Sequence, residues 1–535
     1  MCGIFLYVSY HSNRIYSKLI EDKFEKIKHR GPDTSSFRCL KGDDYDIYIG
    51  FHRLKINDLS NLGDQPFVND NDKQFFICNG EIYNCLDLIE EYKESVNIKS
   101  SSDCEIIYEL FNKNVKSKYD ICNDIDGVFA FIYVDLIKQT ITIARDPIGV
   151  RSLYIGYDFE EWNNFGICSE AKSLINITDK IEYFKPGTIS TFDLKQRCIV
   201  ETIKYSNLTN FNTIYGSKMF DYNFCKKNIF DVLNNAVNKR MHSDRNIACL
   251  LSGGLDSSII CALVAKNMKD KNMDVKKLHT FCIGMKGATD LEHAKNVAEH
   301  IGTTHHEVII DKNDLLRSID DTIIQIESYD ITTVRASTPM YFLSKYIKSL
   351  SDLDIAVLFS GEGSDELSGS YLYFHNAPDH KNFIDETKRL VNSLYKYDVL
   401  RADKSTSGAG LELRVPFLDK YFVSSYINID PSFKMKNGIE KFILRDTFKE
   451  FLPHSVVWRT KEAFSDGVSK IEESWHTIIQ NYCSNQNLSE ESYYKKIFDY
   501  HYPNQRHLIP CYWMPKWTIA KCPSARELDI YNTKK

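Results

Sequence analysis

The sequence predicts two domains of different fold class: an α+β domain built on antiparallel sheet, then an α/β domain with a doubly wound parallel sheet and a helical C-terminal part. The length supports two domains, because the 535 residues are 43% hydrophobic and a single core stops growing at about 250–300 residues. The first part carries short β-type runs between turn signals. The second part alternates apolar strands with helical patterns, which is typical of parallel sheets.

Strand patterns in the first domain are short and lie between turn residues. We expect strands from Gln74 to Cys78, from Val128 to Asp135 and from Thr140 to Ala144. Lys185-Pro186-Gly187 is a turn signal near the end of this domain. A polar stretch follows from Ser206 to Asn223. The expected limits are 2–205 for the first domain, 206–225 for the linker and 226–535 for the second domain.

Beyond the linker, apolar runs and helical patterns follow one another along the chain. Strands that alternate with helices imply a parallel sheet whose ligands bind at the carboxyl ends of the strands. From about Ser364 onward the pattern is mainly helical. The predicted strands are Asn246 to Leu251, Leu278 to Gly284, Glu307 to Ile310 and Asp354 to Phe359, and two predicted helices are Ser257 to Asn267 and Asp290 to Ile301.

Net charge and cysteine content narrow the class of ligand and the compartment. A formal charge of -6 and a pI near 6.2 give no positive field for nucleic acid or anionic lipid, so we expect small-molecule substrates, no nucleic acid and no membrane. No apolar run approaches the roughly 20 residues that cross a bilayer, and the first residues lack a basic leader. The 15 cysteines form no CxxC pair, which favours reduced thiols and a cytoplasmic location.

Cys2 is the first candidate catalytic residue, since removal of Met1 places a thiol and a free α-amino group on one residue. The thiol has a reference pKa of about 8.5 and the amine one of about 7.7–8.0, so at neutral pH the amine can accept the thiol proton. Amide hydrolysis then needs no separate histidine. A cysteine at position two is also often incidental, so Cys2 alone does not establish this chemistry.

Other residues of the first domain also suit an amide-hydrolysing site, and two of them directly follow the first predicted strand. Asn79 and Gly80 offer a side-chain amide and a backbone N–H to one point, as an oxyanion hole does. The planar guanidinium of Arg53 suits an α-carboxylate. Glu81 and Asp103 suit an α-ammonium. Each of these residues also has a plain structural interpretation, as part of a turn or of an exposed surface.

Six short motifs follow in order along this part of the chain: Cys2-Gly3-Ile4, His29-Arg30-Gly31-Pro32-Asp33, Arg53-Leu54, Asn79-Gly80-Glu81-Ile82-Tyr83-Asn84, Ser102-Asp103 and Arg145-Asp146-Pro147-Ile148-Gly149. They resemble the motifs of the class II glutamine amidotransferases. By that resemblance Cys2 is the nucleophile, with an oxyanion hole at Asn79 and Gly80. The implied fold is the four-layer αββα sandwich of N-terminal nucleophile hydrolases. The implied glutamine-binding residues are Arg53, Asn79, Gly80, Glu81 and Asp103.

A glycine-rich segment, Ser252-Gly253-Gly254-Leu255-Asp256-Ser257-Ser258, lies between a predicted strand and a predicted helix. Glycines there expose backbone N–H groups and the helix N-terminus favours an anion, so the segment suits a phosphate. The Gly-Lys-Ser/Thr ending of a Walker loop is missing, which disfavours γ-phosphoryl transfer. The segment resembles instead the pyrophosphate loop of enzymes that adenylylate a carboxyl or carbonyl group. A structural helix cap is the alternative interpretation.

A second loop, Ser360-Gly361-Glu362-Gly363-Ser364-Asp365-Glu366, follows the predicted strand that ends at Phe359. Because the carboxyl ends of parallel strands lie at one edge of a sheet, this loop should converge on the same crevice. Asp256 and Asp365 are candidate Mg²⁺ contacts there, directly or through water, since a hard cation that bridges phosphates prefers carboxylate oxygen. A tight turn is the alternative interpretation of the second loop.

Further motifs occur in the second domain: Glu327-Ser328-Tyr329-Asp330, Thr332-Thr333-Val334-Arg335-Ala336-Ser337-Thr338-Pro339-Met340, Tyr371-Leu372-Tyr373-Phe374, Glu412-Leu413-Arg414-Val415-Pro416-Phe417-Leu418-Asp419 and Arg459-Thr460-Lys461-Glu462. With the two glycine-rich loops, they resemble the synthetase domain of the glutamine-hydrolysing asparagine synthetase family. The resemblance covers nearly the whole chain. It implies that ATP activates aspartate as β-aspartyl-AMP with release of pyrophosphate, and that ammonia then gives asparagine and AMP. It also implies a homodimer, and the Mg²⁺ expected at Asp256 and Asp365 would accompany the ATP.

The same resemblance assigns roles to single residues of the second domain. Glu362 matches the residue linked to the adenylate intermediate, where a carboxylate suits deprotonation of ammonia. Lys461 suits stabilisation of the departing pyrophosphate. Thr332 and Arg335 are further candidate contacts of aspartate or of the intermediate. For Lys461 and Arg335 the alternative is a solvated charge or a partner at a helix end. The implied ATP-binding residues are Leu250, Ser252, Gly253, Gly254, Asp256, Ser257, Ile283, Ser360 and Gly361.

The chain also departs from this family pattern, and two other functions stay open. Leu367-Ser368-Gly369-Ser370 stands where we would expect an aromatic residue and a Gly-Gly pair. A β-lactam synthetase resembles both domains in layout, but usually lacks the N-terminal cysteine. A non-catalytic homologue that binds metabolites is the second alternative, although such proteins normally lose the nucleophile or phosphate-loop residues that this chain keeps.

Overall fold

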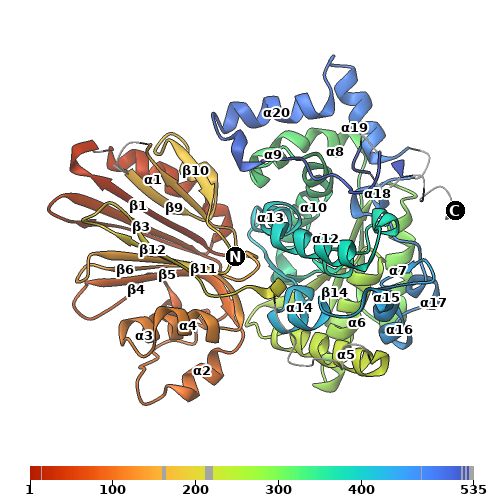
Figure 1. Cartoon of the computed structure of the whole chain (residues 1–535), viewed down its shortest axis with the longest axis horizontal. Helices are drawn as coiled ribbons and strands as arrows, with labels where there is room; N and C mark the ends of the chain where they lie inside the picture. Colours follow the sequence, from red (N-terminus) through yellow and green to blue (C-terminus); the bar gives the residue numbers. More distant parts are fainter. Residues whose placement is uncertain are drawn as a thin grey trace.

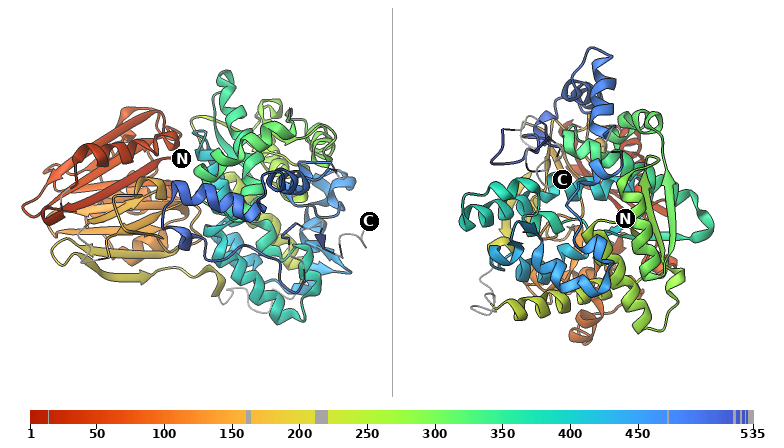
Figure 2. Two further views of the ribbon diagram at one scale, coloured as in Figure 1. Left: turned by 90° about the horizontal axis from the view of Figure 1, so that it is seen from above. Right: turned by 90° about the vertical axis from the view of Figure 1, so that its right-hand side faces the viewer.

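Two domains lie side by side along the longest axis of the molecule, and the N-terminus lies where they meet (Figures 1 and 2). The computed structural model describes residues 1–13, 15–159, 164–210, 221–470, 473–519, 522–524, 527–528 and 530. The first domain consists mainly of strands and the second mainly of helices around a smaller sheet. The change of fold class predicted from the sequence is therefore confirmed.

The first domain contains two six-stranded sheets in which all neighbouring strands are antiparallel. One sheet has the order β10-β8-β9-β1-β3-β2 and the other the order β12-β11-β7-β6-β5-β4. The strands of the first sheet are β1 (Gly3–Tyr10), β2 (Thr34–Lys41), β3 (Tyr45–Arg53), β8 (Tyr154–Tyr157), β9 (Asn164–Cys168) and β10 (Lys180–Tyr183). Those of the second are β4 (Phe67–Val68), β5 (Gln74–Ile82), β6 (Gly127–Asp135), β7 (Thr140–Arg145), β11 (Thr188–Asp193) and β12 (Cys198–Lys204).

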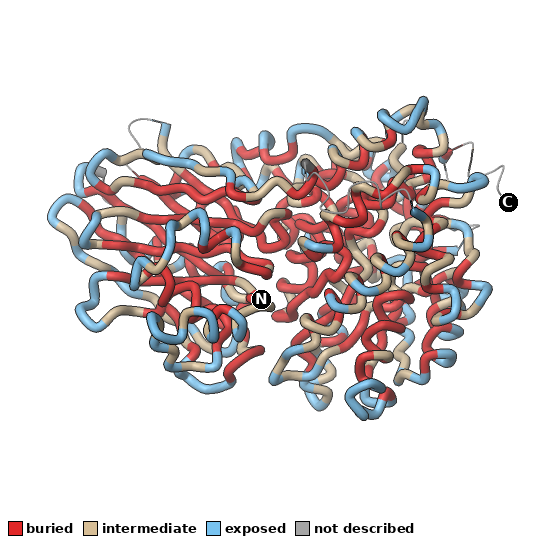
Figure 3. Tube along the Cα trace, turned by 60° about the horizontal axis from the view of Figure 1, so that its bottom comes forward, coloured by how far each residue is buried: buried red, intermediate tan, exposed pale blue. Residues whose placement is uncertain are grey.

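The two sheets pack face to face because each turns an apolar face toward the other. Successive side chains of a strand point to opposite faces, so Ile4, Leu6 and Val8 of β1 share one face. They belong to one buried cluster with Phe75 and Ile77 of β5. Most residues in the strands of this sandwich are buried (Figure 3).

Helices cover the two outer faces of the sandwich. Phe24 of α1 packs on the first sheet, with its ring centroid 5.9 Å from that of Phe5. Phe111 of α3 packs on the second sheet, 5.4 Å from the ring centroid of Phe131. The structure thus confirms the predicted αββα order of layers. The covering helices are α1 (Ser17–Glu25), α2 (Cys85–Glu91), α3 (Glu105–Asn112) and α4 (Lys118–Asp124).

The second domain is organised around a five-stranded parallel sheet with the order β15-β14-β13-β16-β17. The first strand in the chain, β13, lies in the middle, so the direction in which strands are added reverses between β13 and β16. Doubly wound sheets bind their ligands at this reversal. The strands are β13 (Asn246–Leu250), β14 (His279–Gly284), β15 (Thr304–Ile309), β16 (Ile355–Phe359) and β17 (Glu412–Arg414). The four predicted strands are confirmed, and β17 is an addition.

Helices enclose this sheet and form the rest of the domain, as the helical pattern predicted. No helix among the described residues is long and apolar enough to span a bilayer. The helices near the sheet are α5 (Tyr222–Lys239), α6 (Leu255–Asp270), α7 (Thr289–Ile301), α8 (Lys312–Arg317), α9 (Ile319–Ile326), α10 (Ile331–Ser349) and α11 (Ser364–Ser368). Those that follow are α12 (His380–Ser393), α13 (Asp398–Ser407), α14 (Lys420–Tyr426), α15 (Pro431–Lys434), α16 (Phe442–Phe448), α17 (His454–Val457), α18 (Phe464–Gly467), α19 (Trp475–Ser484) and α20 (Glu490–His501), with a hairpin of β18 (Met435–Lys436) and β19 (Ile439–Glu440).

The segment predicted as a linker, 206–225, is described only in part. Helix α5 begins at Tyr222, so the last residues of the predicted linker form the first turn of that helix. Residues 211–220 lie outside the described residues. The domain limits therefore stay a prediction.

Buried charges join the two domains. Arg30 of the first domain lies 2.8 Å from Glu170 and 3.0 Å from Asp403 of α13. The next residue of α13, Lys404, donates a hydrogen bond to the Tyr154 hydroxyl at 2.6 Å. All five side chains are buried. Because removing one partner of a buried ion pair costs about 3–5 kcal/mol, these contacts hold the domains in a defined orientation.

Candidate active sites

Cys2 lies directly before β1, beside the domain interface. Its backbone N–H donates to Asn79 Oδ1 at 3.0 Å, and its Sγ lies 3.9 Å from the Leu54 carbonyl oxygen. Burial raises the pKa of the Cys2 thiol. Met1 precedes it and is buried with 1% exposure. The thiol is thus held in a protected place against the residues predicted to form the oxyanion hole.

Asn79 and Gly80 lie in β5, directly beside β6. The Asn79 Nδ2 amide is buried and has no hydrogen-bond partner among the described residues. A buried donor without a partner is costly, and it therefore marks a place for an acceptor. A side chain at position 80 would place its Cβ 2.8 Å from the Val128 carbonyl oxygen, which explains the glycine. Asn79, Gly80 and Cys2 line one cavity.

The two predicted ammonium-binding carboxylates line the same cavity. Glu81 Oε2 accepts a hydrogen bond from Asn57 Nδ2 at 2.9 Å. Asp103 Oδ2 accepts one from the Ile82 backbone N–H at 2.6 Å. Burial raises the pKa of Asp103, and it raises that of Glu81 well above its usual value. Both carboxylates are therefore poorly solvated and suited to gain from a cationic ligand.

Arg53 also lines this cavity, but its guanidinium is engaged by its own surroundings. Its Nη1 donates to the Ser60 carbonyl at 2.8 Å and lies 2.6 Å from Asp64 Oδ1. Its Nη2 donates to the carbonyls of Asn57 and Asp58. In this conformation Arg53 offers a fixed positive charge at the cavity wall to the carboxylate of a ligand. To bind that carboxylate through two hydrogen bonds, the guanidinium would have to give up some of its present contacts.

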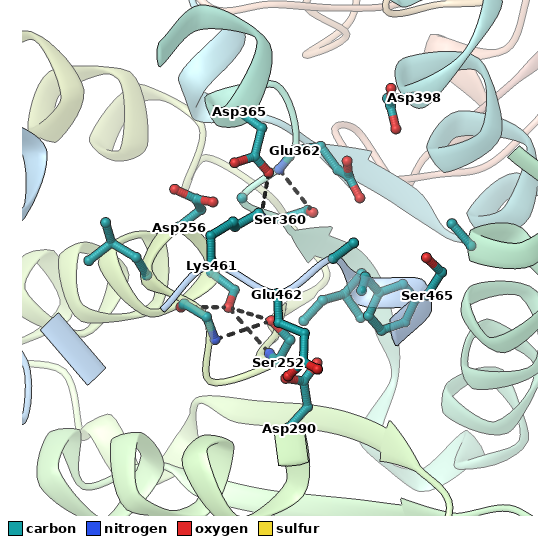
Figure 4. A pocket seen from close by; sticks show the side chains of 18 of the residues that line it. Ser252, Asp256, Asp290, Ser360, Glu362, Asp365, Asp398, Lys461, Glu462 and Ser465 are labelled. Carbon is teal, nitrogen blue, oxygen red and sulfur yellow. Dashed lines mark hydrogen bonds and ion pairs between the residues drawn. The ribbon is translucent and has the colours of Figure 1, made fainter. Parts of the chain in front are cut away.

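The glycine-rich loop after β13 forms one wall of a crevice at the predicted end of the sheet (Figure 4). Ser252 Oγ and Ser257 Oγ lie 3.1 Å apart, and the Gly254 N–H points to Ser252 Oγ at 3.3 Å. Helix α6 begins directly after Gly254, so its N-terminal amides face an anion placed there. Gly253 has φ +70°, and a Cβ would lie 2.4 Å from the Ala294 backbone nitrogen.

The loop after β16 forms the opposite wall. A Cβ at Gly361 would lie 2.6 Å from the Ser257 backbone nitrogen, so only glycine lets the two loops approach this closely. Ser360 and Glu362 line the crevice near Asp365 (Figure 4). The two loops therefore meet at the place where the strand order reverses, as predicted.

Four alternating charges line this crevice. Lys441 Nζ lies 2.6 Å from Asp256 Oδ2 and 2.5 Å from Asp365 Oδ1, and Lys461 Nζ lies 2.6 Å from Asp365 Oδ2. Although burial favours the neutral acid, the two lysines hold the pKa of Asp365 far below its usual value. Ser370 Oγ donates to Asp365 Oδ1 at 2.5 Å. A residue at which the sequence departs from the family pattern thus orients this carboxylate.

Glu362 faces a different partner. Arg401 Nη2 of α13 lies 3.1 and 3.0 Å from the two carboxylate oxygens of Glu362. Arg401 Nε also donates to Asp398 Oδ1 at 3.1 Å. Burial raises the pKa of Glu362, and the nearby Arg401 cation opposes this shift. Such a carboxylate is a stronger base than an exposed one.

Comparison with known proteins agrees with both halves of the molecule. Residues 228–390 and 380–525 match the family model for asparagine synthase, and residues 1–214 match that for a glutamine amidotransferase domain. The chain is 41% identical to the glutamine-hydrolysing asparagine synthetase of Rattus norvegicus over 546 aligned residues, which cover 95% of each chain. It belongs to the glutamine-hydrolysing asparagine synthetase family. The members from Gallus gallus and Homo sapiens are each 40% identical to it, again over 95% of both chains.

Most residues that the sequence singled out for the synthetase half of this family lie around the one crevice. Gly253 is set back from it, but its carbonyl accepts a hydrogen bond from Arg459 at 3.4 Å. The predicted residues that line the crevice are Leu250, Ser252, Gly254, Asp256, Ser257, Ile283, Thr332, Ser360, Gly361, Glu362, Asp365 and Lys461.

Arg335 is the exception among the predicted contacts. It is buried and does not line the crevice. Its Nε and Nη2 lie 2.8 and 2.6 Å from the two carboxylate oxygens of Glu490 in α20. The planar guanidinium thus makes a bidentate pair that holds α20 against α10, and a contact of Arg335 with substrate stays a prediction.

Sequence reasoning missed several charged residues of both sites. Lys441 and Arg401 line the crevice, and Glu412 of β17 lines the cavity of Cys2 although it belongs to the second domain. The segment Glu412-Leu413-Arg414 was recognised only as a family motif. One signal was available for this segment. Glu412 and Arg414 are charged, but the residues around them up to Phe417 are apolar, and charged residues in an apolar segment indicate buried partners.

Proposed function

We propose that this chain makes asparagine from aspartate, with glutamine as nitrogen donor and ATP as the activating substrate. Residues 2–205 would hydrolyse glutamine, and residues 226–535 would form and aminate the aspartyl adenylate. The observation that carries the proposal is the presence, in one chain, of a cavity with Cys2 against an unpartnered buried amide and of a glycine-lined crevice for phosphate. Membership of the family supports the same pairing of sites.

Glutamine hydrolysis begins at Cys2 once Met1 has been removed. The Cys2 amine accepts the thiol proton, and the thiolate attacks the amide carbon of glutamine. Asn79 Nδ2 and the Gly80 N–H receive the oxyanion. Collapse releases ammonia and leaves a thioester on Cys2, which water hydrolyses to glutamate. Arg53, Glu81 and Asp103 hold the α-carboxylate and α-ammonium of the substrate.

Removal of Met1 has two consequences in this proposal. Burial lowers the pKa of the Met1 amine to about 6, and removal of Met1 takes this amine away and gives Cys2 the terminal amine that accepts the thiol proton. Met1 is also buried at the domain interface, in the same apolar cluster as residues of both domains. Its loss opens space between the Cys2 cavity and the second domain, on the side toward which ammonia must move.

Activation of aspartate takes place in the crevice. The β-carboxylate of aspartate attacks the α-phosphorus of ATP, the bond to pyrophosphate breaks, and β-aspartyl-AMP forms. Ser252, Gly254 and Ser257 would hold the pyrophosphate through hydroxyl and backbone N–H donors. Lys461 and Lys441 supply positive charge where negative charge develops on the leaving group.

The carboxylates of Asp256 and Asp365 fit a Mg²⁺ ion that is shared with phosphate. Mg²⁺ usually takes one or two carboxylates and completes its shell with water and substrate phosphates, and no larger cluster of metal ligands occurs among the described residues. Bound there, Mg²⁺ would neutralise phosphate charge. Lys441 lies between the same two carboxylates and occupies part of this position in the structure.

Amination of the adenylate uses Glu362. Its carboxylate, with a pKa raised by burial, accepts a proton as ammonia attacks the acyl carbon and AMP leaves. Arg401 orients that carboxylate through its two contacts.

A cytoplasmic location and a homodimer belong to the same proposal, and the 15 free cysteines are consistent with a reducing compartment.

The proposal is tested with purified protein whose free Cys2 amine has been verified by intact mass. Glutamine, aspartate and ATP together should give asparagine, glutamate, AMP and pyrophosphate, and omission of any one substrate should stop asparagine formation. No product from protein with a free Cys2 amine would favour a non-catalytic homologue. Productive use of another acid in place of aspartate would refute the substrate assignment.

A further inference from the structure

Strand β17 is one edge of the parallel sheet in the second domain, yet two of its side chains belong to the surroundings of the glutamine cavity. Glu412 and Arg414 are two residues apart, so they lie on the same face of the strand. Glu412 lines the cavity that contains Cys2. Arg414 is buried with 1% exposure. The second domain thus presents a buried carboxylate and a buried guanidinium to the first.

The contacts of Arg414 fix its guanidinium in one orientation. Its Nε donates to Glu412 Oε1 at 2.9 Å, and its Nη1 donates to the carbonyls of His242, at 2.6 Å, and Arg240. Its Nη2 lies 3.0 Å from Glu81 Oε2 in the first domain, an ion pair without hydrogen-bond geometry. Three of these partners belong to the second domain and hold the side chain, and the remaining contact crosses the interface to a predicted glutamine ligand.

Neighbouring side chains hold Glu81 through one of its two carboxylate oxygens, Oε2. Oε2 lies between Asn57 Nδ2, at 2.9 Å, and the Arg414 guanidinium. Oε1 has no hydrogen-bond partner among the described residues, and Glu81 lines the Cys2 cavity. Burial drives the pKa of Glu81 well above its usual value, and Arg414 is the first opposing charge. An ionised Glu81 therefore depends on the cation that the second domain supplies.

The backbone of Arg414 reaches the other site. Its carbonyl oxygen accepts a hydrogen bond from the Ser360 N–H at 3.0 Å, in register with the pairing of Phe359 and Arg414 between β16 and β17. Ser360 begins the loop that carries Glu362. One residue of β17 thus touches a glutamine-site carboxylate through its side chain and the adenylation loop through its backbone.

We propose that Arg414 is a positioning residue for glutamine: it holds Glu81 as an oriented anion, so that Oε1 receives the α-ammonium of the substrate. This inference rests on the proposed function. It means that the glutamine site is completed by the second domain, and that docking of the domains is needed for glutamine to bind. It adds a role to a residue that does not itself touch substrate or reacting atoms.

The expected effect is on the KM for glutamine. Without the guanidinium, Glu81 would be a buried carboxylate with only one polar partner, and it would take up a proton or turn away. We expect Arg414→Met to raise KM for glutamine about 10- to 100-fold, the range for a lost charge-assisted contact in a buried site. The kcat for glutamine hydrolysis should change much less, because Cys2, Asn79 and Gly80 are untouched.

The decisive test is a double-mutant cycle in the full-length chain. The variants are Arg414→Met, Glu81→Gln and the double variant, each measured for KM and kcat of glutamine hydrolysis and for ammonium-dependent asparagine synthesis. If Arg414 acts through Glu81, the double variant should have no higher KM than Glu81→Gln alone. Multiplied effects in the double variant, or an unchanged KM in Arg414→Met, would overturn the proposal.

Arg240→Met is the matched control. Arg240 is equally buried in the same interface and pairs with Asp419 at 2.7 Å, without a contact to Glu81. In a double variant of Arg240→Met and Glu81→Gln, the factors by which the two substitutions change the KM for glutamine should multiply. If Arg414→Met does not fold, Arg414→Lys takes its place in the cycle and should restore part of the affinity for glutamine. Absence of glutamine hydrolysis by the unaltered chain would instead refute the proposed function.

Discussion

Replacing Lys441 by methionine should destabilise the second domain by about 3 kcal/mol, and Mg²⁺ should reverse part of this loss. Lys441 Nζ contacts Asp256 Oδ2 at 2.6 Å and Asp365 Oδ1 at 2.5 Å. The two carboxylate oxygens are thus no more than roughly 5 Å apart, and at an effective dielectric constant of about 20 two unit charges at that distance repel by about 3 kcal/mol. Methionine keeps most of the volume and removes the charge.

Thermal unfolding measures this effect. A loss of about 3 kcal/mol should lower the midpoint of the second domain by roughly 5–10 °C in the presence of EDTA. Mg²⁺ should then raise the midpoint more in Lys441→Met than in the unaltered protein, because the ion takes the place of the ammonium between two carboxylates. Differential scanning calorimetry with and without Mg²⁺ gives both values.

Lys434→Met is the matched control for this experiment. Lys434 is also buried, but its Nζ contacts the carbonyl oxygens of Leu367, at 3.4 Å, and Ile427, at 3.2 Å, and the ring of Tyr426. It pairs with no carboxylate among the described residues. Its replacement should produce no Mg²⁺-dependent recovery. The reasoning is refuted if Mg²⁺ raises the midpoints of both variants and of the unaltered protein equally, or if Lys441→Met is as stable as the unaltered chain in EDTA.

Cys2→Ala should abolish glutamine-dependent synthesis and preserve synthesis from ammonium salts, since only the nitrogen source is lost; equal loss of both rates would contradict separate sites. Glu362→Gln should leave glutamine hydrolysis intact and lower asparagine formation and aspartate-dependent pyrophosphate release by about 10²–10⁴-fold, and an undiminished rate would remove Glu362 from the mechanism. Burial lowers the pKa of His52 to about 4, below the value of about 6.5 expected for the unfolded chain. Keeping His52 neutral therefore contributes about 3 kcal/mol to the free energy of unfolding above pH ~6.5, and this contribution is lost as the pH falls toward ~4. The melting temperature should fall less between pH 7 and 5 in His52→Phe than in the unaltered protein; equal falls would contradict the shift.

Local sequence pattern was enough to place the sheet of the second domain. Strands that are buried on both faces read as continuous apolar runs, and the predicted run from Asp354 to Phe359 corresponds to β16 at Ile355–Phe359. Strand β17 has only three residues, and two of them, Glu412 and Arg414, are charged. No local pattern marks such a strand, because its charges are made favourable to bury by partners in the first domain, Glu81 and Arg151, which are distant in sequence.

The glycine-rich loops were predictable for a similar reason. The conformation of Gly253 and the close approach at Gly361 leave room for no side chain, so the requirement appears in the sequence as a glycine. Long-range charge partners leave no such mark. Arg335 pairs with Glu490, 155 residues further along the chain, and Lys441 lies far in sequence from both aspartates that it joins.

Transfer of nitrogen between the two sites is the central claim, and isotope labelling tests it most directly. The enzyme would receive glutamine labelled with ¹⁵N in the side-chain amide, together with aspartate, ATP and an excess of unlabelled ammonium. If ammonia passes through the enclosed interface beside Cys2, the asparagine formed should carry ¹⁵N well above the isotopic content of the bulk ammonium. Asparagine with the isotopic content of the bulk solution would contradict the account.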